Sequence, residues 1–309
     1  MLRSLLIYLS RAKWAQKIVM GWGLARRVVR RFVAGETEDE AVAAIRALNA
    51  RGFTATVDVL GESVTDAAMA RDAAGAYLHL IERIEQEGLQ AWVSVKLTAL
   101  GLDIDAALCR QHMRDILACA RERDIRVTVD MEDRHYTQAT LDMVRALRYE
   151  DGFENVRAVI QAYLYRTDED IRTLAAEGFG VRLCKGAYKE PPDVAYPKKS
   201  DVDASMVRNM KVLLDAAKEG RGYPGIATHD ARIIEIAKAY AAEHAIPRER
   251  FEFQMLHGVR TGLQEQLVAE GYGMRVYVPF GTQWYPYFMR RLAERPANVW
   301  FFVSSLFKR

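Results

Sequence analysis

Two cationic side chains interrupt an apolar stretch in the middle of the chain. Arg182 and Lys185 follow Val181 and Leu183, and Gly186 comes directly after the lysine. Burying a charge costs free energy unless the charge is paired, so the two cations are expected to meet either carboxylates or an anionic ligand. Glycine also lets the backbone approach another group closely. These residue types indicate either a structural ion pair or a strand end that binds a ligand.

Other short apolar stretches also end in polar or charged side chains. These are Asp58 and Glu62, Lys96, Asp130 with Glu132 and Asp133, Gln161 and Tyr163, Thr228 with His229 and Asp230, Gln254 and His257, and Tyr277. Strands that served only packing would not need so many polar ends. A register shift of one residue would turn a given side chain outward, so the pattern is stronger evidence than any single position.

Some of these groups also have interpretations without a catalytic function. Lys96 and Asp130 could pair with each other across neighbouring strands, and His229 could be a hydrogen-bonded histidine at the rim of the fold. His229, Asp230 and His257 are residue types that bind metals, but they include no closely spaced pair of ligands. We therefore expect no metal site.

Eight predicted strands alternate with predicted helices. Strands are expected near 53–60, 91–97, 125–132, 156–163, 180–184, 225–230, 251–257 and 274–281. Helices are expected near 37–50, 65–87, 103–122, 137–148, 168–177, 201–219, 231–243, 261–270 and 284–294. This alternation predicts an α/β fold, a TIM-like (βα)8 barrel whose polar strand ends share one rim. The alternative is a doubly wound open sheet, but it normally has fewer strands, and its Gly-x-Gly-x-x-Gly is missing from the early turns.

Composition excludes several classes of protein. Half of the 309 residues are hydrophobic, and acidic and basic residues nearly balance at a net charge of +3. This balance, without helix-turn-helix or zinc-finger spacing, argues against a nucleic-acid partner. Three cysteines argue against a disulfide framework and for a reducing compartment. No segment has the roughly 18 uninterrupted apolar residues that a membrane span needs.

The beginning of the chain differs from the rest in charge. Arginine and lysine recur among apolar residues from Arg3 to Arg31, and the first acidic residue is Glu36. We expect residues 1–35 to form a basic helical segment and residues 36–309 to form a single barrel domain. Three interpretations of the segment stay open. It is a helix packed on the barrel with its basic face in water, a contact with an anionic bilayer, or a targeting peptide without a clear cleavage site.

The last predicted helix places two arginines among large apolar side chains. Arg290 and Arg291 follow Trp284 and Tyr287. A helix across the mouth of the barrel could aim both guanidinium groups at a small carboxylate, because arginine suits bidentate carboxylate binding. Alternatively, the two arginines pair with Glu294 on the helix surface.

A series of motifs in the chain resembles those of the monofunctional bacterial proline dehydrogenases, which are FAD-dependent barrels. The matching segments are Arg31-Phe32-Val33-Ala34-Gly35-Glu36, Val93-Ser94-Val95-Lys96-Leu97-Thr98, Asp130-Met131-Glu132-Asp133, Gln161-Ala162-Tyr163, Arg182-Leu183-Cys184-Lys185-Gly186-Ala187-Tyr188, Ala227-Thr228-His229, Glu252-Phe253-Gln254-Met255-Leu256, and Tyr285-Pro286-Tyr287-Phe288-Met289-Arg290-Arg291-Leu292-Ala293-Glu294. They span the chain from about residue 31 to residue 294, and as an ordered set they are specific.

The resemblance implies an activity and its partners. It implies oxidation of L-proline to Δ1-pyrroline-5-carboxylate by hydride transfer to N5 of FAD, with the electrons passed on to a membrane quinone. This reaction would be the first step of proline catabolism to glutamate, in the cytoplasm or on the inner face of the cytoplasmic membrane. The sequence shows no aldehyde dehydrogenase region, so a separate pyrroline-5-carboxylate dehydrogenase is expected to take the next step.

The resemblance also implies a role for individual residues. Those implied at the substrate are Lys96, Arg290 and Arg291 for the carboxylate, Leu256 for the ring, Asp130 and Tyr277 for the pocket wall, and Glu62 for an ion pair with the final helix. Those implied at the flavin are Met131, Gln161, Arg182, Lys185, Gly186, Ala187, Tyr188, Thr228 and His229. Asp130 and Arg182 are the expected catalytic residues, with Arg182 near N5.

The chemistry of proline fits these roles but leaves one group open. Proline is a zwitterion, so its carboxylate needs cations and its ring needs an apolar wall. The protein must hold C5 about 3–3.5 Å from the hydride acceptor, and the charge of Arg182 would favour a reduced, anionic flavin. The proton of the amine goes to Asp130, to another group or to water.

Two hypotheses compete with this function. One is another flavin barrel, of the methylenetetrahydrofolate reductase type, which the pair Arg290 and Arg291 disfavours. The other is a catalytically silent flavoprotein that senses proline. Two departures from the family pattern, Asp230 where asparagine is frequent and His257 where tyrosine is common, affect local hydrogen bonds rather than the class.

Overall fold

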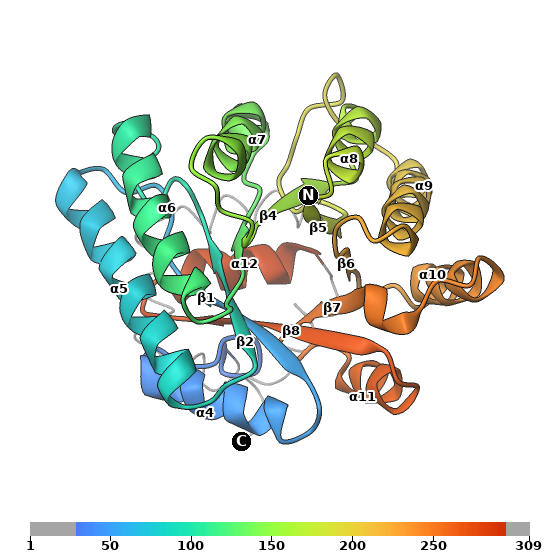
Figure 1. The fold of residues 1–309 in the computed structure, drawn as a ribbon, viewed down its shortest axis with the longest axis horizontal. Coiled ribbons are helices and arrows are strands. Elements are labelled where there is room, and N and C mark those ends of the chain that lie inside the picture. Colours follow the sequence, from blue (N-terminus) through green and yellow to red (C-terminus); the bar gives the residue numbers. More distant parts are fainter. Residues whose placement is uncertain (1–28, 295–309) are drawn as a thin grey trace.

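Eight parallel strands close into a barrel in the computed structural model, which describes residues 29–294 apart from the side chains of Arg290 and residues 292–294 (Figure 1). The strands are β1 Thr54–Val59, β2 Ala91–Val95, β3 Val127–Val129, β4 Val156–Gln161, β5 Gly180–Cys184, β6 Gly225–Ala227, β7 Glu252–Leu256 and β8 Gly273–Phe280. Each strand pairs with its neighbours in sequence, and β8 also pairs with β1, which closes the ring. The predicted barrel is confirmed.

Helices alternate with the strands, and those between consecutive strands form the outer layer (Figure 1). They are α4 Glu38–Asn49, α5 Ala67–Gln86, α6 Ala106–Arg121, α7 Arg134–Tyr149, α8 Thr167–Ala176, α9 Lys199–Lys218, α10 Ala231–Glu243, α11 Thr261–Ala269 and α12 Trp284–Glu294, with a short 3-10 turn, η1 Arg248–Arg250, before β7. Several begin at an acidic N-cap: Asp66, Asp105, Asp133 and Asp230 each accept a backbone N–H of the first turn. Such caps satisfy N–H groups that have no partner within the helix.

Two strands are shorter than the sequence predicted. Strands were expected over 125–132 and 225–230, but β3 and β6 cover only three residues each. The caps explain the difference, because Asp133 and Asp230 begin α7 and α10. The chain must therefore leave the sheet soon after each strand, and the residues between strand and cap become loop at the rim.

The two faces of the strands carry different kinds of residue. Side chains facing the helices are apolar, such as Val93, Val127, Val181 and Val276, and they belong to one continuous core. Alternate positions face the barrel interior, and many of these are charged or polar: Asp58, Ser94, Arg157, Arg182, Glu252, Gln254, Arg275 and Tyr277 are all buried or half-buried. The period of two along a strand thus separates a hydrophobic layer outside the barrel from a polar interior.

The final helix lies over the end of the barrel where the strands finish. In Figure 1, α12 crosses the centre of the ring, and Tyr287 and Arg291 line a cavity with residues from the strand ends. Residues just before α4 support the helix from the side. The indole of Trp284 donates to Glu36 at 2.9 Å, and the rings of Phe32 and Phe288 lie 6.2 Å apart.

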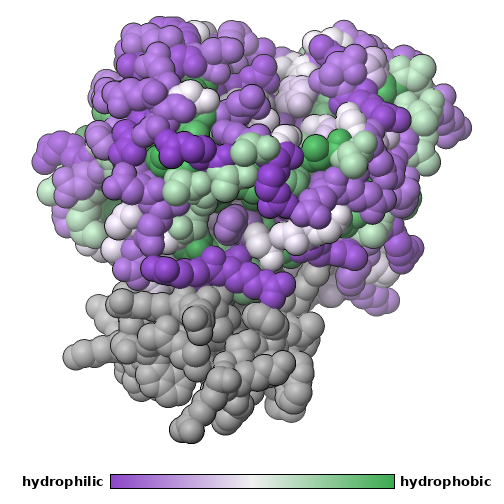
Figure 2. Space-filling view, turned by 90° about the horizontal axis from the view of Figure 1, so that it is seen from below, coloured by the Kyte–Doolittle hydropathy of each residue, from purple (hydrophilic) through white to green (hydrophobic). Residues whose placement is uncertain are grey.

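Figure 2 shows one face of the molecule, which is largely hydrophilic, with hydrophobic residues in patches between hydrophilic ones. Within residues 29–294, no helix has the length and apolar character to cross a bilayer. The expected basic helical segment at 1–35 lies mostly outside the described residues, so its interpretation and the domain boundary at 35 stay predictions.

Candidate active site

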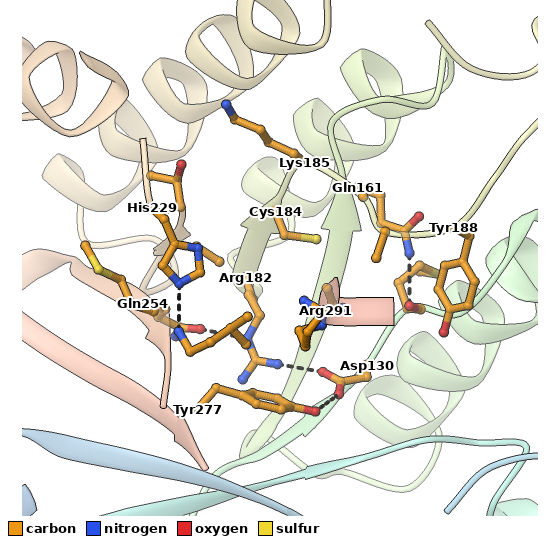
Figure 3. Close-up of a pocket in the computed structure, with 18 of the residues that line it drawn as sticks. Asp130, Gln161, Arg182, Cys184, Lys185, Tyr188, His229, Gln254, Tyr277 and Arg291 are labelled. Carbon is orange, nitrogen blue, oxygen red and sulfur yellow. Dashed lines mark hydrogen bonds and ion pairs between the residues drawn. The ribbon is translucent and has the colours of Figure 1, made fainter. Parts of the chain in front are cut away.

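A cavity of about 530 Å³ opens at the strand ends beneath α12 (Figure 3). It is lined by residues from most of the strands and by two residues of α12. The lining comprises Lys96, Asp130, Met131, Val159, Gln161, Arg182, Cys184, Lys185, Gly186, Ala187, Tyr188, Lys199, Ala227, Thr228, His229, Asp230, Gln254, Met255, Leu256, Arg260, Tyr277, Tyr287 and Arg291. Most residues that the sequence placed at a substrate or a flavin therefore surround one space.

Asp130 is the centre of a hydrogen-bonded group at one side of this cavity (Figure 3). Its Oδ1 accepts from Nη1 of Arg182 at 2.6 Å and from the hydroxyl of Ser94 at 2.8 Å, and its Oδ2 lies 2.8 Å from the hydroxyl of Tyr277. Burial alone would raise the pKa of Asp130, but Arg182 and Lys96 outweigh burial and hold the pKa below its ordinary value. Asp130 is therefore ionised at neutral pH.

Lys96 is held between two carboxylates. Its Nζ donates to Oδ2 of Asp58 at 2.8 Å and lies 3.5 Å from Oδ2 of Asp130. Burial acts against the charge, yet the two carboxylates raise the pKa of Lys96 above its ordinary value. The pairing of Lys96 with Asp130, left open by the sequence, is present, and Asp58 is the closer partner.

The side-chain amide of Gln254 holds Arg182 in place. Its Nε donates to Oε1 of Gln254 at 2.7 Å, and Nε2 of Gln254 donates to Glu252 at 2.6 Å. The amide cannot rotate without losing both bonds, so Gln254 sets the plane of the guanidinium. Gly225 makes room for it, since a Cβ there would lie 2.3 Å from Nε2 of Gln254. Among the described residues, Nη2 of Arg182 is buried and has no hydrogen-bond partner.

Gln161 presents a second buried polar atom at the cavity wall. Its Nε2 donates to the carbonyl oxygens of Met131 and Glu132, at 2.9 and 3.0 Å. Its Oε1 is buried without a hydrogen-bond partner in the described part of the chain. Buried polar groups are almost always paired, so Gln161 and Arg182 are both suited to a polar ligand in the cavity.

The turn after β5 brings backbone into the cavity wall. Gly186 has a φ of +104°, and a Cβ there would lie 2.4 Å from the ring of Tyr163. Only glycine fits this conformation and this contact. The close approach that requires glycine is therefore to Tyr163, and the segment from Lys185 to Tyr188 lines the cavity.

Lys185 pairs with carboxylates instead of pointing at an unfilled site. Its Nζ donates to Asp203 at 2.6 Å and to Asp230 at 3.0 Å. Burial opposes ionisation of Asp230, but the hydrogen bond and charge of Lys185, the backbone N–H of Arg232 and the charge of Lys199 together outweigh burial and lower the pKa of Asp230 to about 2. Of the two alternatives for these cations, a structural ion pair or a ligand, the ion pair is present for both Lys185 and Arg182. Both residues also line the cavity.

His229 makes the hydrogen bond expected of a rim histidine. Its Nε2 accepts from the backbone N–H of Leu256 at 3.0 Å, and its carbonyl oxygen accepts from Arg260 at 2.6 Å. Arg260 adopts a left-handed backbone conformation, with φ at +54°, which is uncommon for a residue with a side chain. No cluster of three or more metal-ligating side chains exists within the described residues.

Two predicted residues, Arg290 and Glu62, do not belong to the described lining of the cavity, whereas Arg291 does. The side chain of Arg290 lies outside the described part of the structure. Glu62 does not line the cavity. Burial is the main cause of the raised pKa of Glu132, and the charge of Glu62 adds a smaller effect in the same direction. The pairing of Glu62 with an arginine of α12 stays a prediction. Arg291 lines the cavity, with its guanidinium 5.1 Å from the centre of the Tyr287 ring.

Several residues of the site were missed by the sequence analysis. Asp58 was noted only as a strand end, Gln254 had no role in the site, and Arg260, Lys199 and Asp203 were not considered. Asp58 and Gln254 carried a usable signal, because each is a polar residue spaced by two along a strand. Arg260, Lys199 and Asp203 carried none, since they lie in a turn and a helix that the barrel brings to the rim.

A closed parallel barrel with buried, converging charges at the carboxyl ends of its strands has the architecture of TIM-barrel enzymes. The comparisons identify the family. The sequence profile described as proline dehydrogenase matches residues 41–303. Proline dehydrogenase 2 of Bacillus subtilis is 43% identical over 99% of both chains, and proline dehydrogenase of Deinococcus radiodurans is 41% identical over 93% of this chain and 91% of its own.

Solved structures agree. A crystal structure of proline utilization A from Bdellovibrio bacteriovorus, inactivated by N-propargylglycine, matches with a TM-score of 0.80 at 28% identity. The match covers 87% of this chain and 32% of that one. The chain belongs to the proline dehydrogenase family and is an oxidoreductase of that class, as the sequence motifs predicted.

Proposed function

We propose that this chain oxidises L-proline to Δ1-pyrroline-5-carboxylate with FAD bound in the cavity at the strand ends. The observation that carries the proposal is the placement of Arg182 and Arg291 in the wall of one cavity, from β5 and from the helix that covers the barrel. FAD, when bound there, supplies the acceptor for the hydride that leaves the proline ring.

The residues on the side of the cavity formed by β4, β5 and β6 suit a flavin nucleotide. Arg182 and Gln161 each offer a buried polar atom that lacks a hydrogen-bond partner among the described residues, one a donor and one an acceptor. The turn at Gly186 packs on the ring of Tyr163, where a Cβ would clash, and it contributes Gly186 to the lining of the cavity. Further contacts are proposed for Met131, Lys185, Ala187, Tyr188, Thr228 and His229, which line the same cavity.

The residues beneath α12 suit a small amino acid. Arg291 and Lys96 bring positive charge to the cavity, and Leu256 offers an apolar surface beside Tyr277. We assign the proline carboxylate to Arg291, Lys96 and Arg290, and the ring to Leu256. Asp130 is ionised and lines the cavity, so it can attract the ammonium group. Glu62 is proposed to pair with an arginine of α12.

The reaction is tested by supplying purified protein with L-proline and an artificial electron acceptor, and by identifying the product by mass spectrometry. Formation of pyrroline-5-carboxylate, with none from protein heated beforehand, is the expected result. Binding of proline without any product would instead support a silent proline sensor.

We further propose that the electrons pass to a membrane quinone, that a separate pyrroline-5-carboxylate dehydrogenase consumes the product, and that the enzyme works in the cytoplasm at the inner face of the membrane. Support for the membrane contact is the basic, acid-free sequence before Glu36, because such segments attract anionic lipid. Sedimentation with anionic vesicles, but not with neutral ones, is expected. Equal sedimentation in both would contradict the contact.

A further inference from the structure

Asp58 is a buried carboxylate behind the wall of the cavity. It is 0% exposed and does not line the cavity itself. Its Oδ2 accepts from Nζ of Lys96 and lies 2.8 Å from the hydroxyl of Tyr277. Its Oδ1 lies 3.2 Å from the hydroxyl of Tyr77, on α5. The carboxylate thus has partners on both sides, and two of them, Lys96 and Tyr277, also reach the cavity.

A single phenol joins Asp58 to the carboxylate that faces the cavity. The hydroxyl of Tyr277 lies 2.8 Å from Oδ2 of Asp58 and 2.8 Å from Oδ2 of Asp130. A phenol has one proton to donate. It can donate to only one carboxylate at a time, and the other contact becomes a hydrogen bond when that carboxyl itself holds a proton. The bridge therefore fits a state in which the two carboxyl groups share one added proton.

The surroundings push the two carboxyl groups in opposite directions. Burial raises the pKa of Asp58, with help from the charge of Asp130 and against the effect of Lys96, whereas the pKa of Asp130 is lowered. The charged and titratable groups that face Asp58 are Lys96 after β2, Asp130 after β3, Tyr277 on β8 and Tyr77 on α5. A proton that enters at Asp130 is therefore more stable on Asp58.

We propose that Asp58 accepts the proton that the substrate ammonium group loses before hydride transfer, through Asp130 and the Tyr277 bridge. An N–H bond of the ammonium breaks and an O–H bond forms on Asp130. Asp130 then passes this proton to the oxygen of Tyr277, while Tyr277 gives its own proton to Oδ2 of Asp58. The nitrogen keeps its electron pair, Asp130 and Tyr277 end unchanged, and Asp58 ends neutral.

Binding of the substrate strengthens the acceptor. Under the proposed function, on which this inference rests, the proline carboxylate competes with Asp58 for Lys96. The ion pair of Asp58 with Lys96 then weakens, so the affinity of Asp58 for a proton rises when the ammonium group arrives. The same bridge returns the proton to the cavity after the product leaves.

The test compares wild-type holoenzyme with Asp58→Asn in anaerobic rapid mixing with L-proline, followed by flavin absorbance across about pH 6 to 9. Proton acceptance contributes about 10²–10⁴-fold to such rates. We expect the wild-type bleaching rate to rise with pH to a plateau. We expect Asp58→Asn to lower the limiting rate at least a hundredfold and to remove the inflection, while the dissociation constant of proline changes less than tenfold. A weaker affinity at an unchanged limiting rate would show that Asp58 is only the counter-charge of Lys96, and would overturn the proposal.

Two further variants guard against a folding defect. Tyr277→Phe keeps both carboxylates and removes the bridge, so it should also lose the inflection. Tyr77→Phe removes the hydroxyl on the other side of Asp58 and is expected to keep the rate within about threefold. A normal pH profile in Tyr277→Phe, or losses in Tyr77→Phe equal to those in Asp58→Asn, would overturn the route.

Infrared difference spectra give a readout that does not depend on the rate. Adding proline should produce the carbonyl band of a protonated carboxyl in wild type and not in Asp58→Asn, and the same band in both would contradict the assignment. Wild-type flavin that proline never bleaches would refute the proposed function together with this inference. Bleaching in wild type with an unaltered profile in Asp58→Asn would refute the role of Asp58 alone.

Discussion

The interior of the barrel holds a charged network at each end. Aromatic rings cover the network where the strands begin, whereas the network where the strands end borders a cavity. Where the strands begin, Arg275 donates to Glu252 at 2.7 Å, its guanidinium lies 3.3 Å from the centre of the Trp92 ring, and Arg157 stacks on Trp92 and Tyr223. Where the strands end, Asp130 and Arg182 pair beside an open cavity. Similar residue types thus stabilise the fold at one end and are available to ligands at the other.

The two ends are joined by one side chain. We call the end where the strands begin the closed end, and the end beside the cavity the open end. Gln254 accepts from Arg182 and donates to Glu252, so the network at the closed end orients the network at the open end. Among the described residues, each end has a guanidinium with buried nitrogen atoms that lack a hydrogen-bond partner, Nε and Nη1 of Arg157 at the closed end and Nη2 of Arg182 at the open end. The difference is that the guanidinium of Arg157 lies over the rings of Trp92 and Tyr223, whereas Arg182 lines the cavity. A buried charge alone therefore does not mark a catalytic site; an incompletely paired charge beside a cavity is the better sign.

The largest expected effect is at the closed end. Glu252→Ala leaves Arg275 buried without its carboxylate and removes the negative charge that favours the ionised form of buried Arg157. Breaking a buried pair costs about 3–5 kcal/mol. We expect that loss in the free energy of unfolding measured with denaturant. The control is Glu265→Ala, which removes an exposed pair with Arg51 and should cost under about 1 kcal/mol. Equal losses in the two variants would mean that the closed network does not stabilise the barrel.

A matched pair of arginines separates the roles of the two ends. Arg182→Met should lower the rate at which proline bleaches the flavin by about 10²–10³-fold, the usual effect of removing a positioned electrostatic donor. Arg157→Met removes an equally buried guanidinium and should change stability with little change in that rate. Rapid-mixing absorbance measures both. An unchanged rate in Arg182→Met would contradict the assignment of the open end.

The pH dependence of stability has a predicted sign at the open end. Burial raises the pKa of Glu132 to about 7, although Thr98 donates to both of its oxygens. The folded state therefore holds a proton that the unfolded state loses near pH 4.5. This contribution is fully present below about pH 4.5 and is lost as the pH rises through about 7, a change of roughly 3 kcal/mol.

Unfolding by urea at about pH 5 and pH 8 checks that sign. Wild type should lose more stability than Glu132→Gln between the two values, because the glutamine does not titrate. A parallel fall in both proteins would show that Glu132 has an ordinary pKa.

The smallest expected effect concerns the helix over the cavity. Arg291→Met should raise the KM for proline about tenfold or more, since one charge-assisted contact to the carboxylate is worth about 1.5–3 kcal/mol, and should leave the FAD content nearly unchanged. Absorbance of the purified protein gives the flavin content, and steady-state kinetics give KM. Loss of flavin at a normal KM would assign Arg291 to the cofactor instead.

The sequence predicts the barrel well because its signal is repetitive. Along each strand, apolar side chains that face the helices alternate with side chains that face the interior, such as Trp92, Ser94 and Lys96. This period of two can be recognised even when the predicted ends of a strand are wrong by one or two residues. The predicted lengths of β3 and β6 were wrong, because the caps at Asp133 and Asp230 end these strands early.

The site was predictable as a set of residues but not as a network. Motifs indicated that Lys96, Asp130 and Arg182 would gather, and they surround one cavity. Their partners depend on the register between distant strands, which places Asp58 beside Lys96 and Gln254 beside Arg182. Arg260 reaches the cavity from a turn with a left-handed residue, and no periodic pattern precedes it.

The proposed function requires that the open end of the barrel binds a flavin and that proline reduces this flavin. Anaerobic titration of the purified protein with L-proline, followed by its absorbance spectrum, tests it most directly. We predict a yellow protein whose flavin bands bleach as proline is added and return when an electron acceptor is supplied. A protein that binds no flavin, or a bound flavin whose spectrum proline leaves oxidised, would contradict it.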